Sequence, residues 1–385
     1  MFTIMDEKAR RCSGLIQPFV GPFVKNLVVA TLRWVSKVLP LFSIVFTAVI
    51  VGGCSTMNAG IPRQPEVLQK ISFNEIWGYL IRGHENDLTG MEPLTDICYF
   101  SAEVTDEGRI TETIPRPSLA PGVGPAPRIH LVITELSSSA LSHFSMNPVY
   151  GVCPLLIEDI CRVSEGFDGI QIDFETVAAG DAQYFWDFLR ALRDALPSAK
   201  TLSVALPART GPTPDAYLYA KIAPIVDRVM VMAYDEHWSA SSPGPVASLP
   251  WCSAVLDYTQ SIMDNAKIVM GVPLYGRAWQ DKKLARALGF QNVQDIIAGK
   301  NPRIGYQSEL GPYFEYSENV EVRIFYDDIR SLREKLELYK SKAVGSIAFW
   351  RIGLSPADLW DNISSQAPDN LPSPGQGQQS IQSSQ

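Results

Sequence analysis

Short apolar runs recur along the chain and alternate with longer segments in which apolar residues return every three or four positions. Runs of the first kind are typical of buried strands, and segments of the second kind are typical of amphipathic helices. The longer segments predict helices such as Ala182–Ala195 and Asp327–Tyr339. The short runs predict eight strands, at Glu75–Leu80, Asp96–Glu103, Arg128–Glu135, Gly169–Glu175, Thr201–Leu206, Arg228–Tyr234, Lys267–Pro273 and Gly345–Trp350.

Strands that alternate with helices indicate a parallel sheet. Eight strands over roughly 290 residues fit an α/β protein with a (β/α)8 TIM barrel, whose usual size is about 250 residues. An open doubly wound sheet is the alternative, but no glycine-rich phosphate loop follows the first strand. We therefore expect a closed barrel.

The barrel pattern occupies residues 73–363, and the remaining sequence divides into an export segment (1–54), a linker (55–72) and a tail (364–385). The tail consists mostly of Gln, Ser, Pro and Gly, so we expect it to be disordered. Residues 105–127 contain five prolines and three glycines, which predicts a long loop.

The export segment contains an uncharged apolar run over residues 38–53, preceded by three basic residues. This run is short for a transmembrane helix and fits a signal-peptide core. The following Val51-Gly52-Gly53-Cys54 resembles a bacterial lipobox, which implies lipid modification of Cys54 and a membrane-anchored, exported lipoprotein. An uncleaved anchor is the alternative. The nearly forty residues before the run are long for a signal, which leaves open a translation start downstream of Met1.

Composition narrows the classes of function. A formal charge of −8 argues against a nucleic-acid binder, which normally has a basic face. Six cysteines without a Cys-x-x-Cys pair, and only four histidines, argue against a structural zinc site. Cys153 and Cys161 either form a disulfide in an exported protein or are buried free thiols.

The chemistry is concentrated in the expected strand that ends at Glu175. Because side chains on a strand alternate between its faces, Gln171, Asp173 and Glu175 point to one side, and the apolar residues between them point to the helix layer. The polar side then lies inside the barrel and ends at the C-terminal edge, where barrel enzymes build active sites. Two neighbouring acids repel each other, which keeps one protonated, as glycosidic bond cleavage requires. A surface strand with a polar face is the alternative, but its other face would not be continuously apolar.

This strand resembles the Asp-x-x-Asp-x-Asp-x-Glu signature of family 18 glycoside hydrolases, with Asp168, Asp173 and Glu175 at matching positions and Gln171 in place of the middle acid. Further segments over residues 73–360 resemble the family's motifs in the same order: Val231-Met232-Ala233-Tyr234-Asp235, Gly271-Val272-Pro273-Leu274-Tyr275-Gly276-Arg277 and Phe349-Trp350. The segments Tyr234–Trp238 and Pro243–Trp251 resemble the family's spore-germination branch, which cleaves N-acetylglucosamine linkages in cortex peptidoglycan and commonly has an amide at the middle position.

The resemblance implies a substrate-assisted, retaining mechanism without metal or cofactor. It implies three catalytic residues: Glu175 as the acid, Asp173 as the partner of the substrate acetamido group, and Tyr234 as the group that holds the acetamido oxygen. It further implies that the substrate is bound by Asp168, Gln171, Asp235, Tyr275, Arg277 and Trp350. Arg277 has two open roles, contacting a sugar hydroxyl or pairing with Asp235. Trp238, Trp251 and Trp279 either line further sugar subsites or pack at the barrel rim.

An amide at Gln171 cannot take a charge, so we hypothesise that Asp173 stays ionised and that Glu175 is the main titrating group. On this hypothesis Gln171→Asp alters the acidic limb of the pH–rate profile.

A peptidoglycan or chitin hydrolase is the leading interpretation, and the expected partners are a glycan and, through the lipid anchor, a membrane, but no nucleic acid. We expect a monomer. A lectin-like glycan-binding lipoprotein and a scaffold that holds the cell wall to a membrane are the alternatives. The glycan that is cut, and endo or exo action, remain open at this stage.

Overall fold

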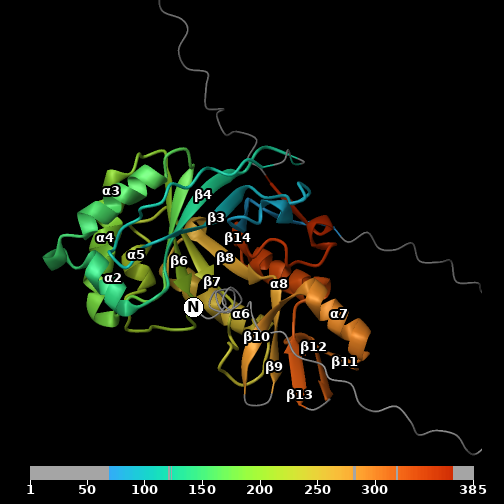
Figure 1. Cartoon of the computed structure of the whole chain (residues 1–385). Coiled ribbons are helices and arrows are strands. Elements are labelled where there is room, and N and C mark those ends of the chain that lie inside the picture. The colour runs from blue at the N-terminus through green and yellow to red at the C-terminus, as the bar shows by residue number, and fades with distance from the viewer. Residues whose placement is uncertain (1–68, 120–121, 123, 281–282, 318–319, 367–385) are drawn as a thin grey trace, which may run out of the picture. The chain divides into compact units, whose positions relative to one another are not determined.

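The computed structural model describes residues 69–119, 122, 124–280, 283–317 and 320–366. Eight parallel strands close into a barrel in the order β14-β2-β3-β4-β5-β6-β7-β8 (Figure 1). This confirms the predicted TIM barrel, and each predicted strand differs from the observed one by two residues or fewer at either end. The strands are β2 (Glu75–Ile81), β3 (Asp96–Glu103), β4 (Arg128–Glu135), β5 (Gly169–Phe174), β6 (Thr201–Pro207), β7 (Arg228–Met232), β8 (Ile268–Pro273) and β14 (Ser346–Trp350).

Helices cover the outside of the barrel. They are α2 (Ser139–Met146), α3 (Cys153–Val163), α4 (Ala182–Ala195), α5 (Tyr219–Ile222), α6 (Leu249–Ile262) and α8 (Ile329–Ser341). The predicted bounds of α4 are confirmed, whereas α8 begins two residues later than predicted because Asp328 caps its N-terminus. Short 3₁₀ turns are η2 (Glu85–Asp87), η3 (Pro148–Tyr150), η4 (Ala179–Asp181), η5 (Asn265–Lys267) and η6 (Leu359–Asp361).

The helix layer fixes the orientation of β5. Phe174 points outward and stacks on Phe185 and Phe188 of α4, with ring centroids 6.3 and 5.5 Å apart. These rings are almost completely buried. Because alternate side chains of a strand face opposite sides, packing Phe174 against α4 places its neighbours Asp173 and Glu175 toward the barrel axis.

An additional α/β unit, which the apolar pattern did not predict, lies between β8 and α8. Its five-stranded antiparallel sheet has the order β10-β9-β13-β12-β11, and α7 packs on it through Val293 (Figure 1). The strands are too short and too unevenly buried to produce a clear alternation. The unit comprises β9 (Tyr275–Gln280), β10 (Lys283–Gly289), α7 (Phe290–Lys300), β11 (Ile304–Gln307), β12 (Gly311–Ser317) and β13 (Glu321–Phe325).

The two ends of the described barrel chain meet in a small parallel pair, β1 (Ile71–Phe73) and β15 (Ile363–Ser365). The expected domain limits at residues 73 and 363 each fall within one of these strands. No helix among the described residues is long and apolar enough to cross a membrane. The proposed lipidation site Cys54 and the apolar run before it lie outside the described residues.

The cysteines that could have formed a disulfide are free. Cys153 and Cys161 are both partly buried residues of α3. Eight residues of helix separate them by about 12 Å along the axis, which is too far for a disulfide. Of the two interpretations of Cys153 and Cys161, free thiols are therefore confirmed, and both are partly buried.

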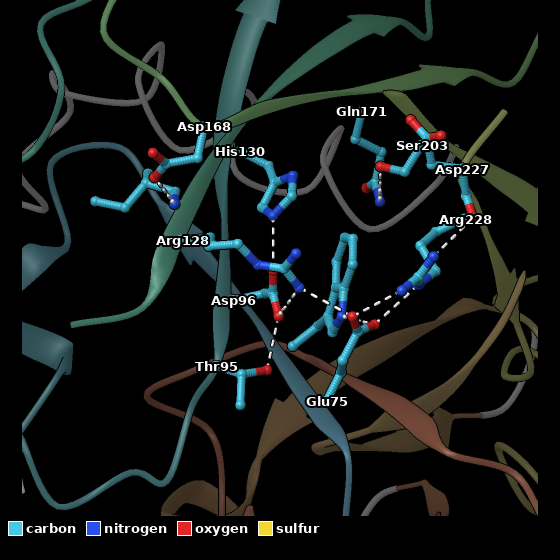
Figure 2. Close-up of polar contacts among 12 residues, drawn as sticks. Glu75, Thr95, Asp96, Arg128, His130, Asp168, Gln171, Ser203, Asp227 and Arg228 are labelled. Carbon is cyan, nitrogen blue, oxygen red and sulfur yellow. Dashed lines mark hydrogen bonds and ion pairs between the residues drawn. The ribbon is translucent and has the colours of Figure 1, made fainter. Parts of the chain in front are cut away.

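A buried charge network closes the N-terminal end of the barrel (Figure 2). The Glu75 carboxylate accepts hydrogen bonds from Arg128 (2.9 Å) and from Arg228 (2.9 and 3.0 Å). Arg128 also binds Asp96, which in addition contacts His130 Nε2 at 2.8 Å and accepts a hydrogen bond from Thr95 Oγ1 at 2.6 Å. This network joins charged side chains of four strands, β2, β3, β4 and β7. Gly169 begins β5 here because any Cβ at this position would collide with the His130 ring.

This network predicts a pH-dependent contribution to stability. Burial alone would raise the pKa of Glu75, but hydrogen bonds and charges from Arg228 and Arg128 outweigh it and lower the pKa from 4.5 to about 2. A pKa unit corresponds to about 1.4 kcal/mol, so the ionised carboxylate stabilises the fold by roughly 3 kcal/mol. Because the folded pKa is lowered, this contribution is present above pH 4.5 and is lost as the pH falls toward 2.

We therefore expect Glu75→Gln to lower the free energy of unfolding by roughly 3 kcal/mol at pH 7, as measured by denaturant titration, and by much less near pH 2. Glu107→Gln, at an exposed position, is the matched control and should change little. A destabilisation by Glu75→Gln of equal size at both pH values would contradict the ionic account.

Candidate active site

A cleft of about 300 Å³ opens at the C-terminal ends of the barrel strands. This is the end at which barrel enzymes carry their catalytic groups. The lining combines acids, phenols, aromatic rings and one guanidinium group. The residues are Tyr79, Phe100, Asp173, Glu175, Ala205, Pro207, Ala208, Arg209, Met232, Tyr234, Asp235, Trp251, Tyr275 and Trp350. Six of the nine residues to which the sequence assigned catalytic or substrate-binding roles are in this list.

The two acids of the β5 strand both reach the cleft. Asp173 is 5% exposed, and its Oδ1 has no hydrogen-bond partner, whereas Glu175 is half-buried one step beyond the strand end. Burial, and then the negative charge of Glu175, raise the pKa of Asp173 well above its usual value. The hypothesis that Asp173 stays ionised is therefore wrong. Burial and a nearby like charge both favour the protonated form of a carboxyl group.

Gln171 lies deeper in the barrel and does not line the cleft, so its predicted contact with substrate is corrected. It is fully buried. Its Oε1 accepts a hydrogen bond from the Tyr79 hydroxyl, and its Nε2 donates to Ser203 Oγ at 3.3 Å. The amide thus bridges β2, β5 and β6 underneath Asp173. Its role in the structure is to position Tyr79, which itself lines the cleft.

Tyr234 and Asp235 follow the end of β7 and line the opposite wall. Burial, and then the charges of Asp173 and Glu175, raise the pKa of Tyr234 far above its usual range, so its phenol keeps its proton and is a hydrogen-bond donor. Asp235 adopts a left-handed backbone with φ 62°, which is costly for a residue with a side chain. Its carboxylate accepts a hydrogen bond from Tyr275 Oη at 2.6 Å and pairs with Arg277.

Of the two roles open for Arg277, the structure shows pairing with Asp235. Arg277 is 2% exposed and is absent from the cleft lining, so the prediction that it binds substrate directly is corrected. Its guanidinium holds the strained Asp235 in place from below.

The floor of the cleft is aromatic. Trp350, the last residue of β14, lies edge-on to Tyr79 and Phe100 with ring centroids 5.0 and 5.1 Å apart. Three rings from three strands thus form one apolar surface, of the kind that covers the C–H face of a sugar. Trp350 was predicted to lie here, but Tyr79 and Phe100 were not. Both are aromatic residues in the C-terminal halves of expected strands, which was the available signal.

Asp168, the first acid of the motif, is at the other end of β5. Its Oδ2 pairs with Arg116 at 2.6 Å and accepts the Ile129 backbone N–H at 2.7 Å. Although burial opposes it, these hydrogen bonds lower the pKa of Asp168. The prediction that Asp168 binds substrate is therefore corrected, because it precedes the strand and fastens the N-terminal side of the barrel.

The three tryptophans with two open roles have different positions. Trp251 of α6 lines the cleft. Trp279 is buried against Phe325 and donates to the Ser241 carbonyl at 3.1 Å, so it is a packing residue. Trp238 is 44% exposed on the loop after β7. That loop is joined to the additional α/β unit through the Ala285 N–H, which donates to the Ser239 carbonyl at 2.8 Å.

A residue that sequence reasoning missed supports the segment containing Glu175. Glu135, the last residue of β4, is 2% exposed, and its backbone carbonyl accepts the Glu175 N–H at 3.1 Å. Its carboxylate accepts hydrogen bonds from the hydroxyls of Ser142 and Thr176. On the other side, the Val177 N–H donates to the Tyr217 hydroxyl at 2.9 Å. The backbone N–H of Glu175 and the two residues that follow it, Thr176 and Val177, are therefore held, which restricts the direction of the Glu175 side chain.

Among the described residues, no group of three or more His, Cys, Asp or Glu side chains is arranged to hold a metal ion. The arrangement of the cleft is a pair of carboxyls, a protonated phenol and an aromatic floor at the C-terminal end of a barrel. These features define a class of barrel proteins that use their own carboxyl groups to act on sugars.

Residues 156–354 match the family model "Glycosyl hydrolases family 18", and the chain belongs to this family. The cortical fragment-lytic enzyme of Bacillus anthracis is 30% identical over 288 residues, which cover 69% of this chain and 66% of that protein. Endochitinase 1 of Metarhizium robertsii is 30% identical over 242 residues, covering 54% of each protein. The chain spans between about half and two thirds of the length of its curated Bacillus relatives.

Solved structures agree on the fold. The spore cortex-lytic enzyme SleL of Bacillus cereus superimposes with a TM-score of 0.68 and 26% identity, covering 77% of this chain and 76% of that chain. A chitinase from Chromobacterium violaceum has a TM-score of 0.65, covering 75% of this chain and 98% of that one. At 22% identity, this second likeness concerns the fold alone.

Proposed function

We propose that this protein is a retaining glycoside hydrolase that cleaves β-linked N-acetylglucosamine in peptidoglycan-type glycans. The observation that carries the proposal is the convergence of Asp173, Glu175 and Tyr234 above the aromatic floor of one cleft. A site that only bound sugar would have no use for a buried carboxyl pair, because each acid costs free energy of desolvation. In a catalytic site, by contrast, Asp173 and Glu175 each have a role in the reaction.

In the proposed mechanism, Glu175 donates its proton to the leaving glycosidic oxygen. The carbonyl oxygen of the substrate's own 2-acetamido group attacks the anomeric carbon as that bond breaks, which gives a cyclic oxazolinium ion. Tyr234, which keeps its proton, donates a hydrogen bond to the attacking oxygen. Water then attacks the anomeric carbon and displaces the acetamido oxygen, while Glu175 takes a proton from that water; two inversions at this carbon leave the sugar with its original configuration.

Asp173 acts on the acetamido nitrogen. Its unpartnered Oδ1 accepts the acetamido N–H and thereby orients the nucleophilic oxygen. In the empty site Asp173 resists ionisation, because it is buried and lies near the negative charge of Glu175. When substrate arrives, positive charge develops at the sugar ring and stabilises the ionised form of Asp173. Trp350 stacks beneath this ring.

Peptidoglycan is the proposed substrate because cortex-active enzymes of Bacillus are among the relatives with the longest matched regions. Chitin is the second candidate, since an endochitinase is equally identical over a shorter region. A non-catalytic glycan-binding protein is the alternative function.

Incubation of the purified chain with peptidoglycan and with chitin oligosaccharides separates these functions. New reducing ends, with the β-anomer formed first in proton NMR spectra, support a retaining hydrolase, and mass spectrometry of the fragments gives the linkage that is cut. Glycan binding without new reducing ends would replace the hydrolase with the glycan-binding protein. The absence of both binding and cleavage would remove both functions.

We also propose that the catalytic barrel, residues 73–363, is exported and attached to a membrane through lipid on Cys54. The support is the apolar run followed by Val51-Gly52-Gly53-Cys54, since acyl chains bind bilayers by burying methylene groups at about 0.8 kcal/mol each. Incorporation of labelled fatty acid that disappears in Cys54→Ser tests it, and labelling that persists in this variant would reject it.

A further inference from the structure

One cation stands in a cleft that is otherwise acidic or neutral. Among the residues that line the cleft in the described part of the chain, Arg209 is the one lysine or arginine, beside Asp173, Glu175 and Asp235. Arg209 follows β6 on the loop to α5. The mechanism above gives Arg209 no role, and a neutral oligosaccharide has no charged group with which Arg209 could pair.

The guanidinium of Arg209 is held rigidly and is not fully used. One terminal nitrogen pairs with Asp215, and the other donates to the Ala208 carbonyl at 3.0 Å. Asp215 is itself fixed, because its Oδ1 accepts the Tyr217 N–H at 2.9 Å. The Nε of Arg209 is buried without a hydrogen-bond partner. Each terminal nitrogen of a guanidinium carries two N–H groups, so the contacts with Asp215 and Ala208 leave further donors for an anionic oxygen.

Arg209 lies close to the place where the scissile bond must sit. β5 and β6 are hydrogen-bonded neighbours, with Ile172 opposite Val204, so Glu175 and Arg209 project from adjacent strand ends. The general acid must touch the scissile oxygen, and the sugar that departs with that oxygen lies next to it. Tyr234, which donates to the acetamido oxygen of the other sugar in the proposed mechanism, follows β7, so Arg209 after β6 lies between Glu175 and Tyr234 in the strand order.

We propose that Arg209 is a specificity-determining residue that binds a carboxylate on the departing sugar. This inference rests on the proposed function. In a glycan that alternates N-acetylglucosamine with its 3-O-lactyl derivative, cleavage after N-acetylglucosamine releases the 4-hydroxyl of the lactyl sugar. The lactyl group, which ends in the carboxylate, is then carried by the ring carbon adjacent to the one that bears the scissile oxygen. Arg209 offsets the repulsion between this carboxylate and the acids of the cleft, and its planar donors match a carboxylate.

The test compares two forms of one substrate. Glycan strands freed of peptides carry free lactyl carboxylates, and coupling with methylamine converts these to neutral amides. We expect the unaltered chain to cleave the acid form with a kcat/KM about tenfold higher than the amide form, a ratio typical of one charge-assisted hydrogen bond. Arg209→Met should bring this ratio to about one, and Arg209→Lys, which keeps the charge but loses the planar fork, should give an intermediate ratio.

The ratio is insensitive to a general loss of folded protein, because both substrates are cut by the same sample. Arg190→Met, which removes a cation from the outer surface of α4, is the matched control and should keep the ratio of the unaltered chain. A ratio near one in the unaltered chain, or a ratio that survives Arg209→Met, would overturn the assignment. If neither substrate is cut, the proposed hydrolase function fails, and the ratio of dissociation constants for the two strand forms decides on Arg209 in the same way.

Discussion

Glu175→Gln is expected to lower kcat for glycan cleavage by about a hundred- to ten-thousandfold, the usual contribution of a general acid. Glutamine has nearly the same shape as glutamate, so the cleft keeps its form. It has no proton of suitable acidity to give to the leaving oxygen, and afterwards no base to activate water. Both halves of the proposed mechanism therefore fail in the same variant. The measurement is the rate of reducing-end release from peptidoglycan strands at saturating substrate.

Binding should persist in this variant, because the aromatic floor and the other polar groups are untouched. Removing the charge of Glu175 also removes the repulsion that it exerts on Asp173, so the dissociation constant should stay within a few-fold of the original. Glu165→Gln, at an exposed position after α3, is the matched control and should cleave normally. A Glu175→Gln variant that cleaves at the unaltered rate would remove Glu175 from the chemistry and with it the proposed mechanism.

Asp173→Asn is expected to separate activity from stability. The amide cannot stabilise the positive charge that develops near the acetamido group, so kcat should fall about a hundred- to a thousandfold, as when one preorganised electrostatic group is removed. Reducing-end release again gives the rate. The fold, by contrast, should become more stable at neutral pH, because a buried carboxyl group that resists ionisation is replaced by a neutral amide.

The sign of the pH dependence follows from the raised pKa of Asp173. In the unfolded chain this carboxyl loses its proton near pH 4, whereas in the folded protein it keeps the proton to higher pH. The protein therefore has the full contribution of the protonated group below pH 4 and loses stability as the pH rises through the folded pKa. Asp173→Asn lacks this loss, so its advantage in Tm should grow from about pH 4 upward. A stabilisation of 1 kcal/mol corresponds to a rise in Tm of about 2–4 °C in large domains.

Calorimetric melting of both proteins across this pH range provides the measurement. Asp194→Asn, on the exposed side of α4, controls for the removal of one negative charge and should give a Tm difference that does not grow with pH. A Tm difference for Asp173→Asn that shrinks as the pH rises would mean that the folded protein ionises Asp173 readily. That result would support the hypothesis from the sequence that Asp173 stays ionised.

The expectation for Asp173 failed for a reason that can be stated. The sequence shows an amide at 171 and two acids at 173 and 175 on one face, which suggested that Asp173 would stay ionised beside an uncharged amide. In the folded barrel the amide of Gln171 is already engaged by Tyr79 and Ser203. Those partners come from strands 92 and 32 residues away in sequence, so no local pattern could have revealed them.

The sequence by itself determined the barrel strands and the inward face of β5. Both are local properties, because the two-residue alternation of a strand and the burial of its apolar face decide which side chains share a side. The resemblance of its motifs to family 18 also pointed to Glu175, Asp173, Tyr234 and Trp350 as site residues, and all four line one cleft.

Only the tertiary structure decided which polar residues near these motifs reach the cleft. Asp168 belongs to the signature in sequence, yet the length of β5 carries it to the opposite end of the barrel, where it binds Arg116. Arg209 belongs to no motif, yet the pairing of β5 with β6 brings it beside Glu175 in the cleft lining. Strand pairing and barrel closure join residues that are far apart in the chain, and a pattern with a period of two residues contains no information about those distances.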